Sequence, residues 1–368
     1  MLVVMLVLTL VVIMSDGSRE KLILSGPRQG RDGGPVQKNA APAMAAPLVC
    51  CSMVDVETDF VNWLLDRIPP DPRLEVPPGD DAAVLRPPAM RRTVVSVDML
   101  TEGVDFVLGP DCPPRAVGHK AVAVSLSDLA AMGSRPEAVF VAVCLPRSGG
   151  DAIAHGLLEG IQAITANYGC TLAGGDTNSW DGPLVVSVTA IGSVLPGCAW
   201  RRDGGRPGDL LVVTGACGGS LLGRHLAVQP RVREALAIAG RFDVHAAIDV
   251  SDGLSLDLSR LMKASGLGAI VRLADVPIHA DARRMSQLPG DTTSPLDHAL
   301  SDGEDFELIL AMPAEAAHAL VAAAGQAPLD LPITIIGELT AEPGLVAEDA
   351  HGERTTLTPR GYVHAFEG

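Results

Sequence analysis

The 368-residue chain lacks a surplus of basic residues: its formal net charge is −16 at pH 7, with 28 Lys and Arg against 44 Asp and Glu. General nucleic-acid binders and proteins of anionic membrane surfaces need basic faces. We therefore expect neither nucleic acid nor a membrane among its partners. An ordinary acidic surface accounts for most of the charge, which also suits a protein that concentrates Mg²⁺.

Short motifs of several enzyme classes are missing as well. The seven cysteines contain no C-x-x-C pair, so we expect reduced, mostly buried thiols of a cytoplasmic protein rather than zinc ligands. No G-x-S-x-G elbow or H-E-x-x-H pair occurs, which excludes a nucleophilic hydrolase and a zincin of those types. The glycine-rich stretch Val213–Ser220 has no G-K-[ST], so we interpret it as a structural turn rather than a phosphate cradle.

A hydrophobic run long enough to cross a membrane is not evident. Met1–Met14 is apolar, but a spanning helix needs about 20 residues. No Lys or Arg precedes this run and no A-x-A-like site follows it directly, as a signal peptide would require. Residues 15–52 are rich in Gly, Pro and Ala and lack periodicity. We expect residues 1–52 to be a disordered or mis-assigned N-terminal extension.

The remaining chain has the pattern of α/β domains. Hydrophobic residues make up 47% of the sequence and aromatic residues only 3%, which suits close-packed layers of Ala, Val and Leu. Along the chain, stretches with the apolar spacing of helices alternate with short apolar runs typical of strands. We expect helices at 57–68, 115–132, 152–168, 254–264 and 314–324, and strands at 93–97, 139–145, 171–173, 184–194, 210–214, 246–250, 269–273, 306–311 and 333–336. The Gly/Pro-rich turn at 202–209 reads as a linker, which predicts domains at 53–197 and 198–368.

Acidic motifs recur where an apolar strand meets a turn or inside an apolar helix. They are Gly79-Asp80-Asp81, Ser96-Val97-Asp98, Leu126-Ser127-Asp128-Leu129, Gly174-Gly175-Asp176-Thr177, Asp249-Val250-Ser251-Asp252-Gly253 and Asp302-Gly303-Glu304-Asp305. Each motif alone is weak evidence: Gly79-Asp80-Asp81 is explained as an ordinary turn, whereas Asp128 among apolar residues is poorly explained as a surface charge. Together they place many carboxylates where burial costs free energy unless a cation compensates it. Because Mg²⁺ takes oxygen ligands and bridges carboxylates to phosphates, the motifs predict a metal–nucleotide site.

The order of these motifs resembles the thiamine-monophosphate kinase family of the aminoimidazole-ribonucleotide-synthetase-like superfamily. The matching pieces are G-D-D-A-A-V-L at 79–85, D-x-L-x-E-G-V-x-F at 98–106, K-A-V-A-V-S-L-S-D-L-A-A-M-G at 120–133, G-G-D-T at 174–177, R-x-G-x-x-P-G-D at 202–209, D-V-S-D-G-L at 249–254 and G-E-D-F-E-L at 303–308. The resemblance covers about residues 53–366. It implies a two-domain α/β fold with mixed sheets flanked by helices, and a homodimer formed through the N-terminal domains.

The resemblance also implies an enzyme that transfers the γ-phosphoryl group of ATP directly to thiamine monophosphate, giving thiamine diphosphate, with several Mg²⁺ ions and no covalent nucleophile. The positions that correspond to metal contacts are Asp81, Ser96, Val97 (through its backbone), Asp98, Asp128, Asp176, Asp249 and Asp252. Those that correspond to nucleotide contacts are Gly175, Asp176, Arg202 and Ser251. Those on the thiamine side are Asp105, Glu304 and Tyr362.

Several positions depart from that family's pattern. Asp105 stands where the family often has His, Val97 where Thr is common and Asp302 where Gly is common, and the stretch 223–230 is short, as though a helix were missing. Two alternatives stay open. One is another ATP-using enzyme of the superfamily, such as an aminoimidazole ribonucleotide synthetase or a selenophosphate synthetase, although Cys50-Cys51 fits the latter poorly. The other is a non-catalytic nucleotide-binding relative, which would have lost metal acids.

Overall fold

The computed structural model describes residues 62–79 and 82–363, which belong to one structural unit, Asp55–Gly368. The expected extension at 1–52, the start of the first expected helix and Asp81 lie outside the described residues. Within the described part, a helical turn occupies 62–65. No helix there is long and apolar enough to span a bilayer.

The first half of the unit forms a four-stranded mixed sheet. Its strand order is β3-β6-β4-β5, with β4 and β5 parallel and the other neighbours antiparallel. The strands are β3 (Arg92–Thr101), β4 (Arg135–Pro146), β5 (Thr171–Trp180) and β6 (Val185–Val194). Each was expected from its apolar run, and three of the four extend beyond it. A small antiparallel pair, β1 (Leu74–Val76) with β2 (Val84–Leu85), precedes them.

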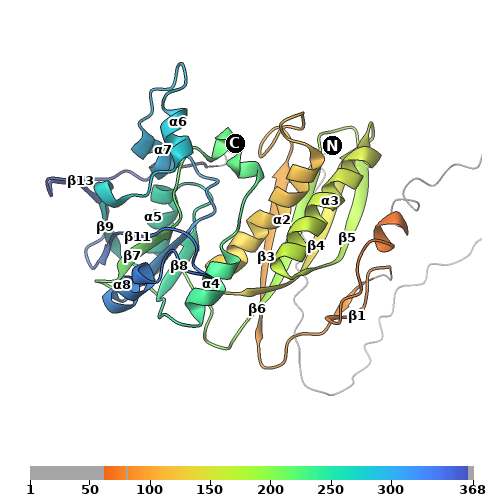
Figure 1. Cartoon of the computed structure of the whole chain (residues 1–368), viewed down its shortest axis with the longest axis horizontal. Coiled ribbons are helices and arrows are strands. Elements are labelled where there is room, and N and C mark those ends of the chain that lie inside the picture. Colours follow the sequence, from red (N-terminus) through yellow and green to blue (C-terminus); the bar gives the residue numbers. More distant parts are fainter. Residues whose placement is uncertain (1–61, 80–81, 364–368) are drawn as a thin grey trace, which may run out of the picture. The chain divides into compact units, whose positions relative to one another are not determined.

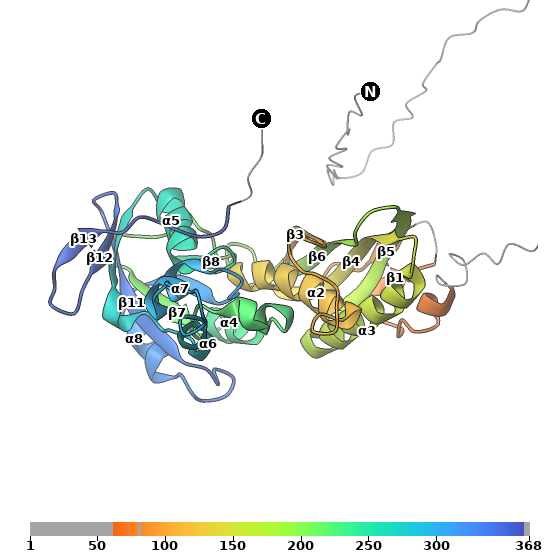
Figure 2. The same ribbon diagram turned by 90° about the horizontal axis from the view of Figure 1, so that it is seen from above.

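Two long helices, α2 (Pro114–Ala131) and α3 (Gly150–Tyr168), lie side by side over one face of this sheet (Figures 1 and 2). Their backbones meet at glycines. A Cβ added to Gly118 would lie 2.2 Å from the Leu157 carbonyl oxygen, and one added to Gly160 would lie 2.0 Å from that of Arg115. Only glycine therefore permits this crossing. Helix α2 begins with a proline in its first turn, where no N–H is needed, and is buried on most sides.

The second half forms a seven-stranded mixed sheet of order β13-β12-β9-β11-β7-β10-β8. Its strands are β7 (Leu210–Thr214), β8 (Ala246–Asp249), β9 (Gly268–Arg272), β10 (Leu308–Met312), β11 (Ile333–Thr340), β12 (Leu345–Glu348) and β13 (Arg354–Thr356). The helices are α4 (Val232–Ala239), α5 (Leu254–Ser265), α6 (Ala280–Met285), α7 (Pro295–Ser301) and α8 (Ala314–Ala322). The short elements α4, α6, α7, β12 and β13 were not expected, because a few residues show little periodicity.

The segment that follows β7 packs against helix α2 of the first half. The short stretch 223–230 holds the 3-10 turn η2 (Arg224–Leu226), which follows another, η1 (Ser220–Leu222). Both η2 and α4 pack against α2, as does β8. Helix α2 thereby joins the two halves, and one hydrophobic cluster contains residues of both, from Leu100 to Ile333. The α/β class with mixed sheets is confirmed, while the division into independent domains near residue 197 stays a prediction.

The cysteines of the described part are all free thiols. Cys112, Cys170 and Cys217 are buried, Cys144 is partly buried, and among the described cysteines only Cys198 is exposed. Burial raises the pKa of the Cys170 thiol to about 12. These thiols are packing residues, as the absence of C-x-x-C pairs indicates.

Candidate active site

Strand β3 and helix α2 bring the first acids together. Ser96 and Asp98 alternate with exposed residues along β3, so both side chains face α2. Ser96 Oγ donates a hydrogen bond to Asp128 Oδ2, and Ser125 Oγ donates one to Asp98 Oδ2 at 2.7 Å. Each carboxylate is therefore oriented by a serine hydroxyl from the opposite element.

The third acid of this group comes from the second sheet. Asp249 ends β8 and is 4% exposed, and its Oδ2 accepts a hydrogen bond of 2.7 Å from Ser127 Oγ. Ser127 precedes Asp128 on α2. Residues separated by more than 120 positions in the sequence thus meet at the end of one helix. We call Asp98, Asp128 and Asp249 the carboxylate cluster.

Burial and mutual repulsion dominate the electrostatics of the carboxylate cluster. Burial, with the Asp128 charge second, raises the pKa of Asp98 to about 6 and that of Asp249 to about 8. Burial also raises the pKa of Asp128, although the Ser96 hydroxyl and the Arg202 guanidinium act in the opposite direction. Ionised carboxylates here need a nearby cation, because water reaches them poorly.

The donor set of this cluster fits Mg²⁺. All its groups are oxygens, and Mg²⁺ keeps several waters while using only one or two carboxylates per ion. Within residues 62–79 and 82–363, no three His, Cys, Asp or Glu side chains converge on a single ion. Asp98 and Asp128, and Asp128 and Asp249, are instead electrostatic neighbours in pairs. Pairs of carboxylates with open positions suit ions that are completed by water and phosphate.

Strand β5 places Gly175 and Asp176 away from the carboxylate cluster. Asp176 is exposed on the strand at the edge of the sheet opposite β3. Three strand spacings, about 14 Å, separate β5 from β3. The cross-strand register links Asp176 through Ala142 and Ser187 to Met99, so its side chain shares the outer face of the sheet with Met99 rather than with Asp98. The structure does not bring Asp176 to the carboxylate cluster within one chain.

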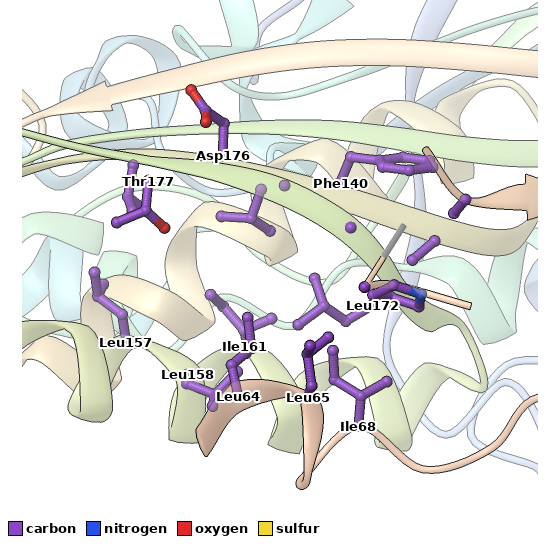
Figure 3. Close-up of a pocket in the computed structure, with 18 of the residues that line it drawn as sticks. Leu64, Leu65, Ile68, Phe140, Leu157, Leu158, Ile161, Leu172, Asp176 and Thr177 are labelled. Carbon is purple, nitrogen blue, oxygen red and sulfur yellow. The ribbon is translucent and has the colours of Figure 1, made fainter. Parts of the chain in front are cut away.

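Beside Asp176 lies an apolar cavity of about 540 Å³. Leu157, Leu158 and Ile161 of α3 form its floor, and the helical segment at 62–68 adds Leu64 (Figure 3). Polar groups enter only at the Gly174–Thr177 end of the cavity and at its rim. In Figure 3, Asp176 points away from the apolar side chains of α3. Gly175 is required in this strand, since a Cβ there would lie 1.9 Å from the Val141 carbonyl oxygen.

A second cavity, of about 510 Å³, adjoins the carboxylate cluster. Ser96 and Asp128 line it together with Arg201 and Arg202, both exposed. Arg201 is paired with Asp203 at 2.5 Å, whereas the Arg202 charge acts on Asp128 and Asp249 and partly offsets the rise that burial causes in their pKa values. Arg202 is thus positioned near both an open volume and the buried acids, as a phosphate-binding arginine would be.

Two motif loops of the second half are joined through their backbones. Glu304 N–H donates to the Ser251 carbonyl at 2.7 Å, and Phe306 N–H donates to that of Val250 at 2.8 Å. Tyr362 N–H donates to the Asp252 carbonyl at 2.9 Å. The expected residues Ser251, Asp252, Glu304 and Tyr362 therefore lie together. The Asp252 side chain is bound to Arg260 at 2.5 Å, so a metal at Asp252 would compete with that arginine.

Asp105 has a local structural role that the sequence left open. Its Oδ2 accepts a hydrogen bond of 2.7 Å from the Thr101 backbone N–H. This carboxylate therefore caps its own turn. The contact of Asp105 with a substrate stays a prediction.

The glycine-rich turn after β7 is occupied by the protein's own acids. Gly218 N–H donates to both oxygens of Asp305 at 2.9 Å, and Gly219 N–H donates to Asp302 Oδ2 at 2.7 Å. These N–H groups are already satisfied by carboxylates and do not cradle phosphate in this arrangement. Asp302 also accepts from the buried His298, which gives a structural reason for an acid at this position.

Lys120 is the site residue that the sequence analysis missed. It stands in α2 with no exposed surface, and its Nζ donates to Glu304 Oε2 at 2.6 Å. A single lysine in an otherwise apolar helical run was the available signal. Its partner could not be found from spacing, because 184 positions separate them.

Comparison with known proteins matches the two halves separately. Residues 79–194 match the family AIR synthase related protein, N-terminal domain, and residues 210–350 match AIR synthase related protein, C-terminal domain. The thiamine-monophosphate kinase of Rhodopirellula baltica is 40% identical over 316 residues, which span 84% of this chain and 97% of that protein. The Escherichia coli K12 thiamine-monophosphate kinase is 36% identical over 307 residues, with 78% and 90% covered.

Solved structures agree with this assignment. Thiamine-monophosphate kinase from Stenotrophomonas maltophilia superposes with a TM-score of 0.67 at 33% identity, covering 82% of this chain and 97% of that one. AaThiL complexed with AMPPCP and TMP gives a TM-score of 0.65 at 25% identity, covering 78% and 91%. These relatives confirm the resemblance, the fold class and the expectation of an enzyme. The chain belongs to the thiamine-monophosphate kinase family of enzymes.

Proposed function

We propose that the protein phosphorylates thiamine monophosphate with ATP, yielding thiamine diphosphate and ADP. The observation that carries this proposal is the carboxylate cluster, in which three acids from β3, α2 and β8 are each held by a serine. The AaThiL complex supports it, because that relative was solved with AMPPCP and TMP. The relatives at 36–40% identity favour this reaction over those of other superfamily members.

Direct in-line transfer is the mechanism that the residues support best. Asp98, Asp128 and Asp249 would hold Mg²⁺, which would neutralise phosphate charge when bound. Arg202 donates to phosphate oxygens from the second cavity. Glu304 and Tyr362 lie beside the 250–252 loop, where an acid and an aromatic ring suit the cationic thiazolium. No nucleophile of the protein is required, because a phosphate oxygen of thiamine monophosphate would attack the γ-phosphorus of ATP directly while ADP leaves.

The apolar cavity beside Gly175 suits the base of the nucleotide. Its size and its leucine- and isoleucine-rich lining fit a flat heteroaromatic ring, and its polar end carries Asp176 and Thr177. Gly175 has no side chain to project from this part of the strand, because the Val141 carbonyl of β4 occupies the Cβ position, so a nucleotide would meet the strand there through backbone groups. We therefore infer that Gly175 and Asp176 contact the nucleotide.

A coupled assay of ADP release tests the reaction. We expect Mg²⁺-dependent ADP release with thiamine monophosphate and none above background with free thiamine or aminoimidazole precursors, because the acid set serves a phosphate acceptor. Phosphorylated product is identified by mass. Equal or faster turnover of free thiamine, or turnover only of an aminoimidazole precursor, would contradict the proposal.

We also propose that the protein is a homodimer through the outer face of the four-stranded sheet. On β3 the outward side chains Val95, Val97 and Met99 are 58%, 63% and 64% exposed. A solvated sheet face normally carries polar residues, so an apolar row indicates an interaction surface. A second copy of the same face would bury this row by two-fold symmetry.

Charge on this face should dissociate the dimer. We expect the double substitution Val95→Glu with Met99→Glu to halve the mass measured by light scattering, since the carboxylates would be buried without partners. Leu288→Glu is the control, because Leu288 is 46% exposed far along the chain, after α6. A monomeric wild-type protein, or a dimer that survives the double substitution, would refute this interface.

A further inference from the structure

Lys120 is a buried cation at the meeting point of three segments. Only four lysines occur in the chain, at positions 21, 38, 120 and 263, and Lys120 has no exposed surface. Its Nζ donates to Glu304 Oε2 at 2.6 Å and to the Asp105 carbonyl at 2.7 Å. Burying an ammonium costs free energy that such charged hydrogen bonds must offset. A residue placed at that cost needs an explanation beyond packing.

Glu304 is held in a defined orientation from both ends. Its backbone has φ of +54° and its N–H donates to the Ser251 carbonyl, so the main chain is fixed next to the Asp249–Gly253 loop. Its side chain is 25% exposed, and Lys120 binds Oε2. Among the described residues, Lys120 is its side-chain partner, and none donates a hydrogen bond to Oε1. Lys120 therefore anchors one carboxylate oxygen, and the side chain as a whole keeps a quarter of its surface exposed.

The loop from Thr101 to Phe106 is anchored by the same ammonium. Asp105 Oδ2 caps Thr101 N–H, and Gly103 N–H donates to the Phe106 carbonyl at 2.7 Å, so the loop is closed by its own bonds. Lys120 binds the Asp105 carbonyl and so fixes this closed loop against α2. Lys120 Nζ thus binds both the 101–106 loop and Glu304, the two segments that the family resemblance assigns to the thiamine side of the site.

The ammonium group suits this task better than a guanidinium would. It carries three N–H donors on one small atom, and it reaches oxygens of two separate segments at 2.6 and 2.7 Å. A guanidinium is planar, larger and directed toward paired oxygens of one group. Arginine is the more common basic residue of this chain, so the composition alone does not explain a lysine at this position. The geometry of the ammonium group does.

We propose that Lys120 is the positioning residue of the acceptor side: it holds Glu304 by one oxygen, which leaves the other to meet the cationic thiamine ring system, and it locks the 101–106 loop at the same point. This inference rests on the proposed function, because it takes thiamine monophosphate as the acceptor. Lys120 acts through Glu304 and does not touch the transferred phosphoryl group.

Steady-state kinetics of Lys120→Met test this role. We expect the KM for thiamine monophosphate to rise roughly tenfold or more, as for a lost hydrogen bond to a charged group, while the KM for ATP stays within about twofold. Lys263→Met is the matched control, since Lys263 is exposed in the last turn of α5, and it should leave both constants unchanged. Lys120→Arg should recover part of the loss.

A double-substitution cycle covers the case in which Lys120→Met folds poorly. Lys120→Met combined with Glu304→Gln removes both charges, which avoids an uncompensated buried acid. If Lys120 acts on the acceptor through Glu304, the losses of the two single variants should not multiply in the double variant, where only the freed 101–106 loop can add to the KM of Glu304→Gln. Circular dichroism of each variant reports folding.

The outcomes separate this inference from the proposed function. An active wild-type enzyme whose KM for thiamine monophosphate is unmoved by Lys120→Met would overturn the positioning role alone. Equal rises in both Michaelis constants, or losses that multiply in the double variant, would do the same. A wild-type enzyme without turnover of thiamine monophosphate would overturn the function and the inference together.

Discussion

Asp128→Asn is expected to lower turnover roughly a thousandfold, with the fold retained. Asp128 lies between Asp98 and Asp249 and raises the pKa of both, so it is the centre of the carboxylate cluster. An amide of the same shape keeps the contact with Ser96 but lacks the charge that would bind Mg²⁺. The expected loss is in kcat, because the metal ions stabilise charge that develops during transfer.

Melting curves give an independent measure of the same change. In EDTA, Asp128→Asn should unfold at the same temperature as wild type or a higher one, because it relieves repulsion among buried carboxylates. Saturating Mg²⁺ with nucleotide should stabilise wild type more than the variant. Asp181→Asn serves as the control, since the Asp181 side chain is 86% exposed. Near-normal turnover of Asp128→Asn at saturating Mg²⁺ would rule out this metal assignment.

Arg231→Met is expected to lower the free energy of unfolding by about 3–5 kcal/mol. Arg231 binds Glu307 through two hydrogen bonds, of 2.6 and 2.5 Å, and the Glu307 side chain is only 2% exposed. Removing the guanidinium would leave a buried carboxylate with Thr214 Oγ1 as its remaining donor side chain. Urea unfolding followed by circular dichroism measures the loss.

Two further variants separate charge from packing at this pair. Arg231→Met with Glu307→Gln should recover most of the stability, because no uncompensated charge remains. Arg354→Met should cost about 0–1 kcal/mol, since its partner Glu348 and Arg354 itself are partly solvated. Equal effects of Arg231→Met and Arg354→Met would show that the buried pair contributes no more than a surface pair.

Periodicity and turn chemistry were sufficient to predict the main layers. The runs at 184–194 and 210–214 became β6 and β7, and the Ala-rich stretch at 115–132 became α2, because each is long and apolar. The expected strand at 306–311 starts only at Leu308. Glu304 and Phe306 both have positive φ, which no pattern of apolar residues reveals.

The candidate site was predictable in its residue types but not in its pairings. Acids at strand ends indicated carboxylate chemistry, and the structure places three of them in one cluster. The serines at 96, 125 and 127 hold these three acids, and Lys120 holds Glu304, through contacts across 27 to 184 positions. Such contacts depend on how α2 packs between the sheets, which the local sequence does not encode. The roles of the individual site residues stay predictions.

Helix α2 fixes the spacing between two parts of the site. Lys120 and Ser127 are seven residues apart and share one side of the helix, so a rise of about 10 Å separates the backbone positions of the residue that holds Glu304 and the residue that holds Asp249. The glycine contacts with α3 prevent the helix from sliding. Substitutions along the helix alter single contacts, whereas one inserted residue would turn every later side chain by about 100°. The spacing of these two residues on α2 therefore sets the distance between the acceptor side, at Glu304, and the carboxylate cluster, at Asp249.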